Sequence, residues 1–353
     1  MKLIKSFTLL IISVISCISG CSGKGKPDES RQSEPVQPLI TDIYSADPSA
    51  HVFNGKIYIY PSHDIDDAEV SDKNGSQYNM KDYHVFSMEK MGTVPKDHGE
   101  VLNIKDVRWA SQFMWAPDAA FKNGTYYFYF PAHDKKGIFR IGVATSKNPE
   151  GPFTPEPSYI PGSFSIDPAV FTDTDGTSYM YFGGLWGGQM EKWTDGRFDA
   201  EQKEPYGSSP ALGPYVAKMS DDMLTFASKP QMISILDQDG NPITGSDNSR
   251  RFFEASWMHK YKDTYYFSYS TGDTHMIVYA TSDKPTGPFT YRGIVLLPVT
   301  GWTNHHSIVE FEGKWYLFYH DCTLSKGTDH LRNVKVTELF YNSDGTIKTI
   351  DPI

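Results

Sequence analysis

Three acidic residues occur in similar local settings but far apart along the chain. Asp47 lies in Ala-Asp-Pro, Asp167 lies in Ile-Asp-Pro, and Glu254 lies between two phenylalanines and Ala-Ser-Trp. Apolar neighbours disfavour a charged carboxylate and raise its pKa, so Glu254 is a candidate proton donor. Asp47 has small neighbours and is expected to stay ionised, as a general base must. Asp167 is expected to raise the pKa of the acid by like-charge repulsion and to hold it in position. A protonated and an ionised carboxyl group together are what hydrolysis of a glycosidic bond requires.

Each acid also has a simpler interpretation. A glutamate between two core aromatics can be a strand-edge residue that reaches solvent, and periodicity does not separate the two cases. An Asp-Pro pair can be a turn that only starts a strand. Three acids at equivalent positions of a repeat make the simpler interpretations less satisfactory.

The elements expected to position these acids are copies of one unit. Each copy has a polar residue, a stretch of small residues, an Asn, Asp or Gly turn and a Tyr-rich strand. The copies begin at Ala46, Trp115, Ile166, Phe253 and Asn304. Near-identical segments, at 141–153 and 277–289, follow two of these hairpins. Five roughly four-stranded units without a helical period predict an all-β chain folded as a five-bladed β-propeller. Two tandem β-sandwiches are the rival, but they do not explain the copied segments.

A propeller brings the start of each innermost strand to one end of the central axis. We therefore expect Asp47, Asp118, Asp167, Glu254 and His305 to converge there. Such a cluster is costly to assemble unless a ligand, a metal or a reaction uses it.

Composition narrows the choice of partner. The chain has 353 residues, a formal net charge of -10 and 14% aromatic residues. No basic cluster follows the N-terminus, which argues against a nucleic-acid partner. Abundant rings suit a sugar-binding surface, although a β-rich core has the same composition.

The N-terminus resembles a bacterial lipoprotein signal. Lys2 and Lys5 precede an apolar run, and the run ends in Ile-Ser-Gly-Cys at Cys21, which resembles a lipobox. We expect a signal peptide at 1–20, acylation of Cys21, a flexible tether at 21–39 and a propeller domain at 40–353. The protein would then be exported and anchored to the bacterial outer membrane, with the face of the membrane left open. A plain secretory signal is the alternative. Cys322 is then the lone cysteine of the mature domain, and a buried small hydrophobe is favoured over a nucleophile.

Five motifs in order resemble glycoside hydrolase family 43. They are Ala-Asp-Pro at 46–48, Trp-Ala-Pro-Asp at 115–118, Ile-Asp-Pro at 166–168, Phe-Glu-Ala-Ser-Trp at 253–257 and His-His-Ser at 305–307. The resemblance implies a five-bladed propeller that hydrolyses with inversion. It makes Asp47 the general base, Glu254 the general acid and Asp167 the modulator of the acid's pKa.

The resemblance also implies further site residues. His305 matches a histidine that holds a divalent cation, usually Ca²⁺, although His306 beside it is an alternative ligand. Arg332 matches an arginine that contacts the sugar. Trp115 and Trp257 are candidates for stacking on the sugar, or each could fill a blade interface. Asp118, by contrast, matches a motif residue that is interpreted as structural more readily than as catalytic.

The expected activity is that of an exo-acting β-D-xylosidase or α-L-arabinofuranosidase on short plant-polysaccharide fragments. The opening of the domain most resembles the β-xylosidase branch, so a xylo- or arabino-oligosaccharide is the expected substrate. The segments 65–81 and 236–251 are expected to wall the pocket. A non-catalytic sugar-binding propeller is the alternative from another class. A C-terminal β-sandwich is not expected, because the sequence ends soon after the fifth repeat.

Overall fold

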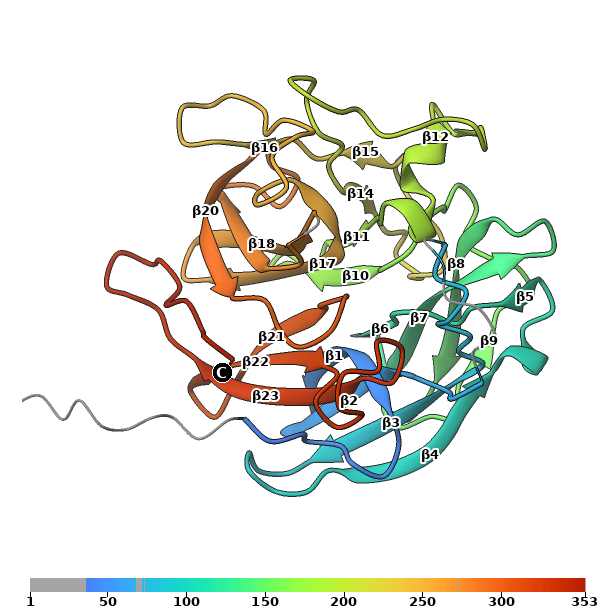
Figure 1. The fold of residues 1–353 in the computed structure, drawn as a ribbon. Helices are drawn as coiled ribbons and strands as arrows, with labels where there is room; N and C mark the ends of the chain where they lie inside the picture. Colours follow the sequence, from blue (N-terminus) through green and yellow to red (C-terminus); the bar gives the residue numbers. More distant parts are fainter. Residues whose placement is uncertain (1–35, 68–71, 73, 273, 353) are drawn as a thin grey trace, which may run out of the picture. The chain divides into compact units, whose positions relative to one another are not determined.

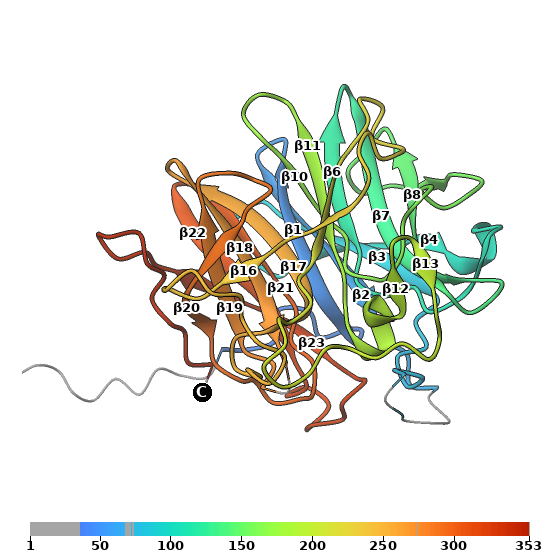
Figure 2. The same cartoon turned by 90° about the horizontal axis from the view of Figure 1, so that it is seen from above.

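The computed structural model describes residues 36–67, 72, 74–272 and 274–352. The expected signal peptide, Cys21 and most of the expected tether lie outside these residues. The described part is the predicted all-β five-bladed propeller, with the sheets arranged around a central axis (Figure 1). Seen from above, the innermost strands again lie in the middle of the unit (Figure 2).

The first blade is the sheet β1 (Ser45–Phe53), β2 (Lys56–His63), β3 (Asp82–Met88) and β4 (Lys96–Asn103). The second contains β5 (Ala110–Gln112), β6 (Asp118–Lys122), β7 (Thr125–Asp134), β8 (Phe139–Ser146) and β9 (Thr154–Pro155). The third contains β10 (Ala169–Thr172), β11 (Ser178–Phe182), β14 (Tyr215–Lys218) and β15 (Gln231–Met232). The fourth contains β16 (Ile235–Leu236), β17 (Phe252–Tyr261), β18 (Thr264–Thr271), β19 (Ile277–Ser282) and β20 (Phe289–Leu296). The fifth contains β21 (His306–Phe311), β22 (Lys314–Asp321) and β23 (Asn333–Leu339).

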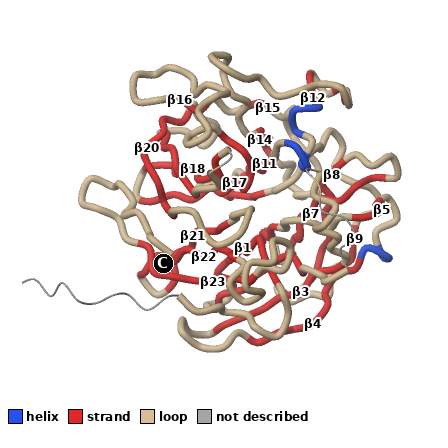
Figure 3. Tube along the Cα trace, viewed as in Figure 1, coloured by secondary structure: helices blue, strands red, loops and turns tan. Residues whose placement is uncertain are grey.

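Little else in the described part is regular (Figure 3). A two-stranded ribbon is formed by β12 (Trp193–Thr194) and β13 (Arg197–Phe198). The helical residues are three short 3₁₀ turns: η1 (Ile104–Asp106), η2 (Trp186–Gly188) and η3 (Met190–Lys192). Among the described residues, no helix has the length and apolar character needed to cross a membrane.

The aromatic strands are explained by burial on both faces of a blade. In β7, Tyr126, Phe128 and Phe130 pack into the cluster shared with the first blade. Tyr127 and Tyr129, which alternate with them, pack into the cluster shared with the third blade. Because successive side chains of a strand point to opposite faces, a strand between two neighbours needs apolar residues at every position. This is why the repeat shows a run of rings and not an alternating pattern.

Tight turns set the register of the inner hairpins. Asn54 and Gly55 join β1 to β2 with φ of 52° and 74°, and Asn123 and Gly124 join β6 to β7 with the same values. Positive φ at both turn residues matches the right-handed twist of the strands, and Asn-Gly is the pair that adopts it most easily.

The ring is closed by the first described residues of the chain. The Leu39 N–H donates to the Val334 carbonyl at 2.7 Å, and the Ser45 N–H donates to the Arg332 carbonyl at 2.9 Å. The segment before β1 therefore lies beside β23 and joins the first blade to the last. The fifth blade differs from the predicted four-stranded unit, because only three strands are paired in its sheet.

Candidate active site

The acidic residues lie where the inner strands are irregular. The β1–β2 register shifts between Ala46 and Ser49, and the β17–β18 register shifts on both sides of Glu254. Asp47, Asp167 and Ala255 have φ of 50°, 57° and 64°. Left-handed backbone at such residues is unfavourable and is found mainly at functional sites, where bulges redirect a side chain.

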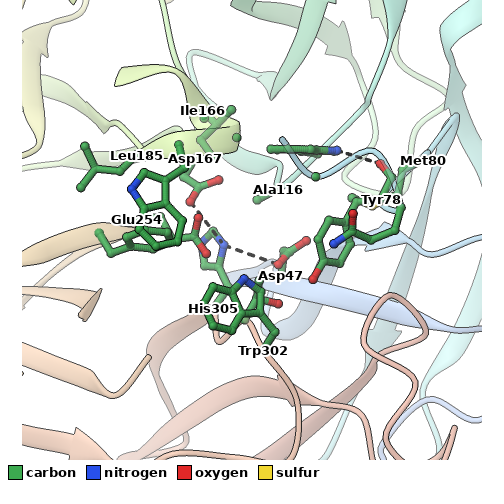
Figure 4. Close-up of a pocket in the computed structure, with 18 of the residues that line it drawn as sticks. Asp47, Tyr78, Met80, Ala116, Ile166, Asp167, Leu185, Glu254, Trp302 and His305 are labelled. Carbon is green, nitrogen blue, oxygen red and sulfur yellow. Dashed lines mark hydrogen bonds and ion pairs between the residues drawn. The ribbon is translucent and has the colours of Figure 1, made fainter. Parts of the chain in front are cut away.

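One cavity of about 560 Å³ receives these side chains. Figure 4 shows Asp47, Asp167, Glu254 and His305 around it, with Tyr78, Met80 and Trp302 opposite or at its edge. Trp115 and Arg332 also line it. The structure thus gathers six of the predicted residues in one pocket and leaves Asp118 and Trp257 outside it.

Asp47 is held as an anion. It is 6% exposed, and burial alone would raise its pKa. The positive charge of Arg332, whose Nη1 lies 3.0 Å from Oδ1, opposes burial, and the Ser62 hydroxyl donates to Oδ2 at 2.6 Å. Together they lower the pKa of Asp47 to about 2.

Arg332 is fixed by a residue that the sequence did not reveal as important. Its Nε and Nη2 donate to the two oxygens of Asp64 at 2.8 and 2.7 Å, and its guanidinium lies 4.8 Å from the Tyr78 ring centroid. A bidentate pair of this kind fixes orientation as well as charge. Asp64 follows His63 directly after β2, and only its place beside a strand end could have indicated a role.

His320 supports the backbone of Asp47. The Asp47 N–H donates to His320 Nδ1 at 3.0 Å, so the ring proton must lie on Nε2, which is 3.1 Å from the Thr303 hydroxyl. Burial, with Arg332 nearby, lowers the pKa of His320 to about 3. The ring is therefore neutral, and its 3.3 Å approach to Asp47 Oδ1 is a contact and not an ion pair.

Asp167 is buried and Glu254 is half-buried, and both have raised pKa values. Burial and the charge of Asp47 raise the pKa of Glu254 to about 8. Burial, Glu254 and Asp47 raise the pKa of Asp167 as well. Asp167 Oδ2 accepts the Ala255 N–H at 2.8 Å, which favours its charged form. Glu254 has no such donor among the described residues, so this contact favours a proton on Glu254 over one on Asp167.

The space around Glu254 depends on a close approach of another loop. The Leu185 N–H donates to the Phe253 carbonyl at 3.0 Å. A Cβ added at Gly184 would lie 2.6 Å from Ile166 and 3.3 Å from the Glu254 Cβ. Glycine at this position therefore lets the loop before η2 approach Glu254 closely.

His305, and not His306, faces the pocket. His305 Nδ1 lies 3.7 Å from Asp47 Oδ1 and 3.9 Å from Asp167 Oδ2. Burial lowers the pKa of His305 to about 4, so its ring is neutral. His306 is turned into the blade, where its Nε2 lies 2.6 Å from the Ser268 hydroxyl.

The surroundings of His305 fit a divalent cation. The distances from Nδ1 to the two carboxylates are too long for hydrogen bonds. They are, however, close to the separation expected between two ligands of one cation, which is roughly 3.4 Å when each metal–ligand bond is about 2.4 Å long. The side-chain amide of Asn304, next in the chain, is fully buried and has no hydrogen-bond partner among the described residues. One imidazole with two carboxylates would leave most of the coordination shell to water.

Two predicted residues lie away from this pocket. Asp118 does not reach it, in contrast to the expected convergence of five side chains. Its carboxylate accepts from Ser49, His51 and the Val170 N–H, so it joins the inner strands of three blades. This arrangement agrees with the structural role expected for Asp118.

Trp257 is the second. Its Nε1 donates to the Ile308 carbonyl at 3.0 Å, and its ring lies 5.5 Å from His51. It borders a different cavity and fills an interface between blades. Stacking of Trp257 on a sugar in the acidic pocket therefore finds no support. Trp115 remains in the wall, where its Nε1 donates to the Tyr78 carbonyl at 2.8 Å.

The walls were predicted in part. Several described residues of the segment 65–81 line the pocket, as expected. None of the segment 236–251 does, and its expected role is wrong. The opposite wall comes instead from Leu185 to Gly188, Trp302 and Asp329. Trp186 and Trp302 are nearly parallel, with ring centroids 6.3 Å apart. Tryptophans within glycine-rich segments were the available signal for them.

Comparison with known proteins places the chain in context. Residues 37–347 match the model for glycosyl hydrolases family 43. A "xylosidase/arabinosidase 43A" of Humicola insolens is 61% identical over 326 residues, which is 90% of this chain and 100% of the relative. A "xylosidase/arabinosidase" of Bacteroides ovatus is 54% identical over 89% of this chain and 97% of its own length.

A solved structure is equally similar. It is a family 43 β-xylosidase/α-arabinofuranosidase from a compost microbial metagenome, crystallised with xylotriose in a calcium-free form. It superposes with a TM-score of 0.89 at 62% identity and covers 90% of this chain and 98% of its own.

Proposed function

The chain belongs to family 43 of the glycosyl hydrolases and is a glycoside hydrolase of the xylosidase/arabinosidase type, and we propose that it removes single sugars with inversion from the ends of xylan-derived oligosaccharides. The observation that carries the proposal is the opposite tuning of two carboxyl groups in one pocket. Arg332 keeps Asp47 ionised, while burial keeps Glu254 protonated at neutral pH.

The proposed reaction is a single displacement. Glu254 gives its proton to the glycosidic oxygen as the bond to the anomeric carbon breaks. Asp47 takes a proton from a water molecule as that water adds to the opposite face of the sugar. One water is consumed, and both carboxyl groups return to their starting states by proton exchange with solvent.

Three other residues position this pair. Asp167 adds negative charge beside Glu254 and raises the pKa of the acid. Arg332 lowers the pKa of Asp47 and is itself oriented by Asp64. These groups act through the two catalytic carboxyls and need no contact with the reacting atoms.

End-specific action is supported by the shape of the site. A cavity of about 560 Å³ lies in the usual range for small-ligand sites and is walled by the segment before β3, by η2 and by Trp302. Walls on several sides suit the end of a chain better than its middle. We propose xylose as the preferred terminal sugar, with arabinofuranose as the second, as the names of both relatives suggest.

We further propose that His305 holds a divalent cation, of which Ca²⁺ is the first candidate. Asp47 and Asp167 are the nearest oxygen donors, and the similar structure described as calcium-free supports a calcium-binding relative. A bound cation would supply positive charge at the axis and stabilise the ionised carboxylates.

Export and anchoring through an acylated Cys21 remain proposals from the sequence alone, because these residues lie outside the described part. Labelled palmitate supplied to expressing bacteria should enter the wild-type protein and not a Cys21→Ser variant. Equal labelling of both proteins would contradict the anchor.

The activity is tested with aryl β-xyloside and aryl α-L-arabinofuranoside, using proton NMR to identify the first-formed anomer. Wild type should release the inverted sugar, and Asp47→Asn and Glu254→Gln should each be strongly impaired. A retained anomer would contradict the single displacement. Unchanged rates in both variants would contradict the assignment of the two carboxyl groups.

A further inference from the structure

A cluster of possible metal ligands lies on the first blade, apart from the acidic pocket. It consists of His63 at the end of β2 and of Asp82 and His84 on β3. One ligand atom from each lies within 4.8 Å of the others, and among the described residues no other three His, Cys, Asp or Glu side chains meet this condition. None of the three lines the acidic pocket.

The sheet accounts for this grouping. Asp82 and His84 are two positions apart on β3, so their side chains share a face, while Tyr83 between them is buried on the other face. β2 and β3 pair antiparallel, which brings the end of β2 beside the start of β3. His63 Nδ1 lies 2.5 Å from Asp82 Oδ1, and the His63 and His84 rings are 5.0 Å apart.

The donor set selects a kind of ion. Two imidazoles with one carboxylate suit Zn²⁺ and similar first-row transition ions, whereas Ca²⁺ requires mostly oxygen ligands. The side chains of His63, Asp82 and His84 are 22%, 15% and 17% exposed, so ions and water reach them. Remaining coordination positions can therefore be filled by water.

A second carboxylate orients one of the imidazoles. Both oxygens of Asp97, on β4, lie 3.1 Å from His84 Nδ1. A proton on Nδ1 that is donated to Asp97 leaves the lone pair on Nε2. Metal-binding histidines commonly have such a carboxylate partner, which fixes the ring and increases its basicity.

We propose that His63, Asp82 and His84 bind one transition-metal cation, with Zn²⁺ as the representative ion, at a site separate from His305. The ion ties β2 to β3. It does so next to Asp64, the residue that holds Arg332. Binding replaces any proton on the ligating atoms and is therefore weaker at low pH.

The test is titration of the metal-free, full-length protein that carries His305→Ala, a change that removes the ligand proposed for the cation in the acidic pocket. Zn²⁺ is followed by calorimetry and Co²⁺ by its visible absorption. We expect one equivalent to bind and a visible Co²⁺ spectrum to appear. His63→Gln and His84→Gln should each weaken binding at least about tenfold, and Asp97→Asn by roughly 10–100-fold.

His98→Gln is the matched control. His98 lies on β4 of the same blade and bonds the Ser87 hydroxyl at 2.8 Å, outside the cluster. The His98→Gln variant should bind Zn²⁺ with the same affinity as the parent. Saturating Zn²⁺ should also raise the Tm of the His305→Ala parent and of its His98→Gln variant but not of its His84→Gln variant.

Absence of binding in the parent, or equal affinities in the parent and the His63 and His84 variants, would overturn the proposal. Equal loss in His98→Gln would also overturn it, because binding would then be spread over surface histidines. If one cluster variant fails to fold, the other and Asp97→Asn still decide the question.

Discussion

Replacing Glu254 by glutamine should show how much proton donation by this residue contributes to the rate of hydrolysis. A glutamate with an ordinary pKa near 4.5 would be protonated in only about 0.3% of molecules at pH 7. The raised pKa of about 8 makes that fraction about nine-tenths, an increase of roughly 300-fold in the competent form. Glutamine has the same shape but cannot donate a proton to the leaving oxygen in the way an acid does.

The loss should depend on the leaving group. Xylobiose has a poor leaving group, and its hydrolysis should fall by up to about 10⁴-fold in Glu254→Gln, the upper range for general acid catalysis. A dinitrophenyl xyloside needs little protonation, and its kcat/KM should fall by less than about tenfold. The fall in wild-type kcat/KM above about pH 8 should disappear in the variant.

Both substrates are assayed from pH 5 to 9 with the same calcium concentration throughout. Glu310→Gln serves as the control, because Glu310 lies on β21 and borders the other cavity. Equal losses on both substrates, or a basic limb that persists in Glu254→Gln, would refute the reasoning.

The other predictions follow from the same contacts. Asp47→Asn should lower kcat/KM by about 10²–10⁴-fold on good and poor leaving groups alike, since the water still needs a base; a leaving-group dependence would contradict this. Arg332→Gln should raise the pKa of Asp47 by about 1–3 units, so the acidic limb of the kcat/KM profile should move to higher pH, provided circular dichroism shows a folded protein. The pKa of Glu254 is higher in the folded than in the unfolded protein, so its contribution to folding stability is present below about pH 4.5 and is lost as pH rises through about 8. The Tm of Glu254→Gln minus that of wild type should therefore increase between pH 5 and 9. A constant difference in Tm would be evidence against this. Cys322 is 1% exposed and burial raises its pKa to about 12, so Ellman's reagent should react only after denaturation.

The fold could be predicted because its defining feature repeats. Five Tyr-rich hairpins recur, and burial on both faces of each blade explains their composition. The acid could be predicted from a local property, since Phe253 and Ala255, which flank Glu254, are both buried. Both features depend on neighbours in the sequence, which is why one chain was enough to find them.

Trp257 shows where such reasoning failed. Successive side chains of a strand point to opposite faces of the sheet, and a bulge shifts this alternation by one residue. Two register shifts lie between Phe252 and Trp257, and Ala255 between them has positive φ. Counting along the sequence therefore does not give the face on which Trp257 lies, and the structure places it between blades.

Asp118 could have been placed more accurately. The Asn-Gly turns at 54–55 and 123–124 are equivalent, and Asp118 is nearer to its turn than Asp47 is to the first. It therefore lies further along the axis, beside Ser49. Alignment by the turn, which fixes the register, would have separated the two aspartates.

The pocket walls were the least predictable part. Loops carry no periodicity that gives their direction, and length alone suggested 236–251. That segment packs elsewhere, for example through the contact of Arg251 with Glu204. Trp186 and Trp302 take the wall position instead, from segments with no strand pattern.

The contact between the first and fifth blades, which closes the propeller, has a consequence for folding. Arg332 accepts the Ser45 N–H through its carbonyl, and its side chain holds Asp47, two residues further along β1. During synthesis, Asp47 emerges long before its guanidinium partner. The base therefore acquires its charge partner only when the final blade docks on the first. The environment that ionises the base is thus completed only by the contact between the two ends of the propeller.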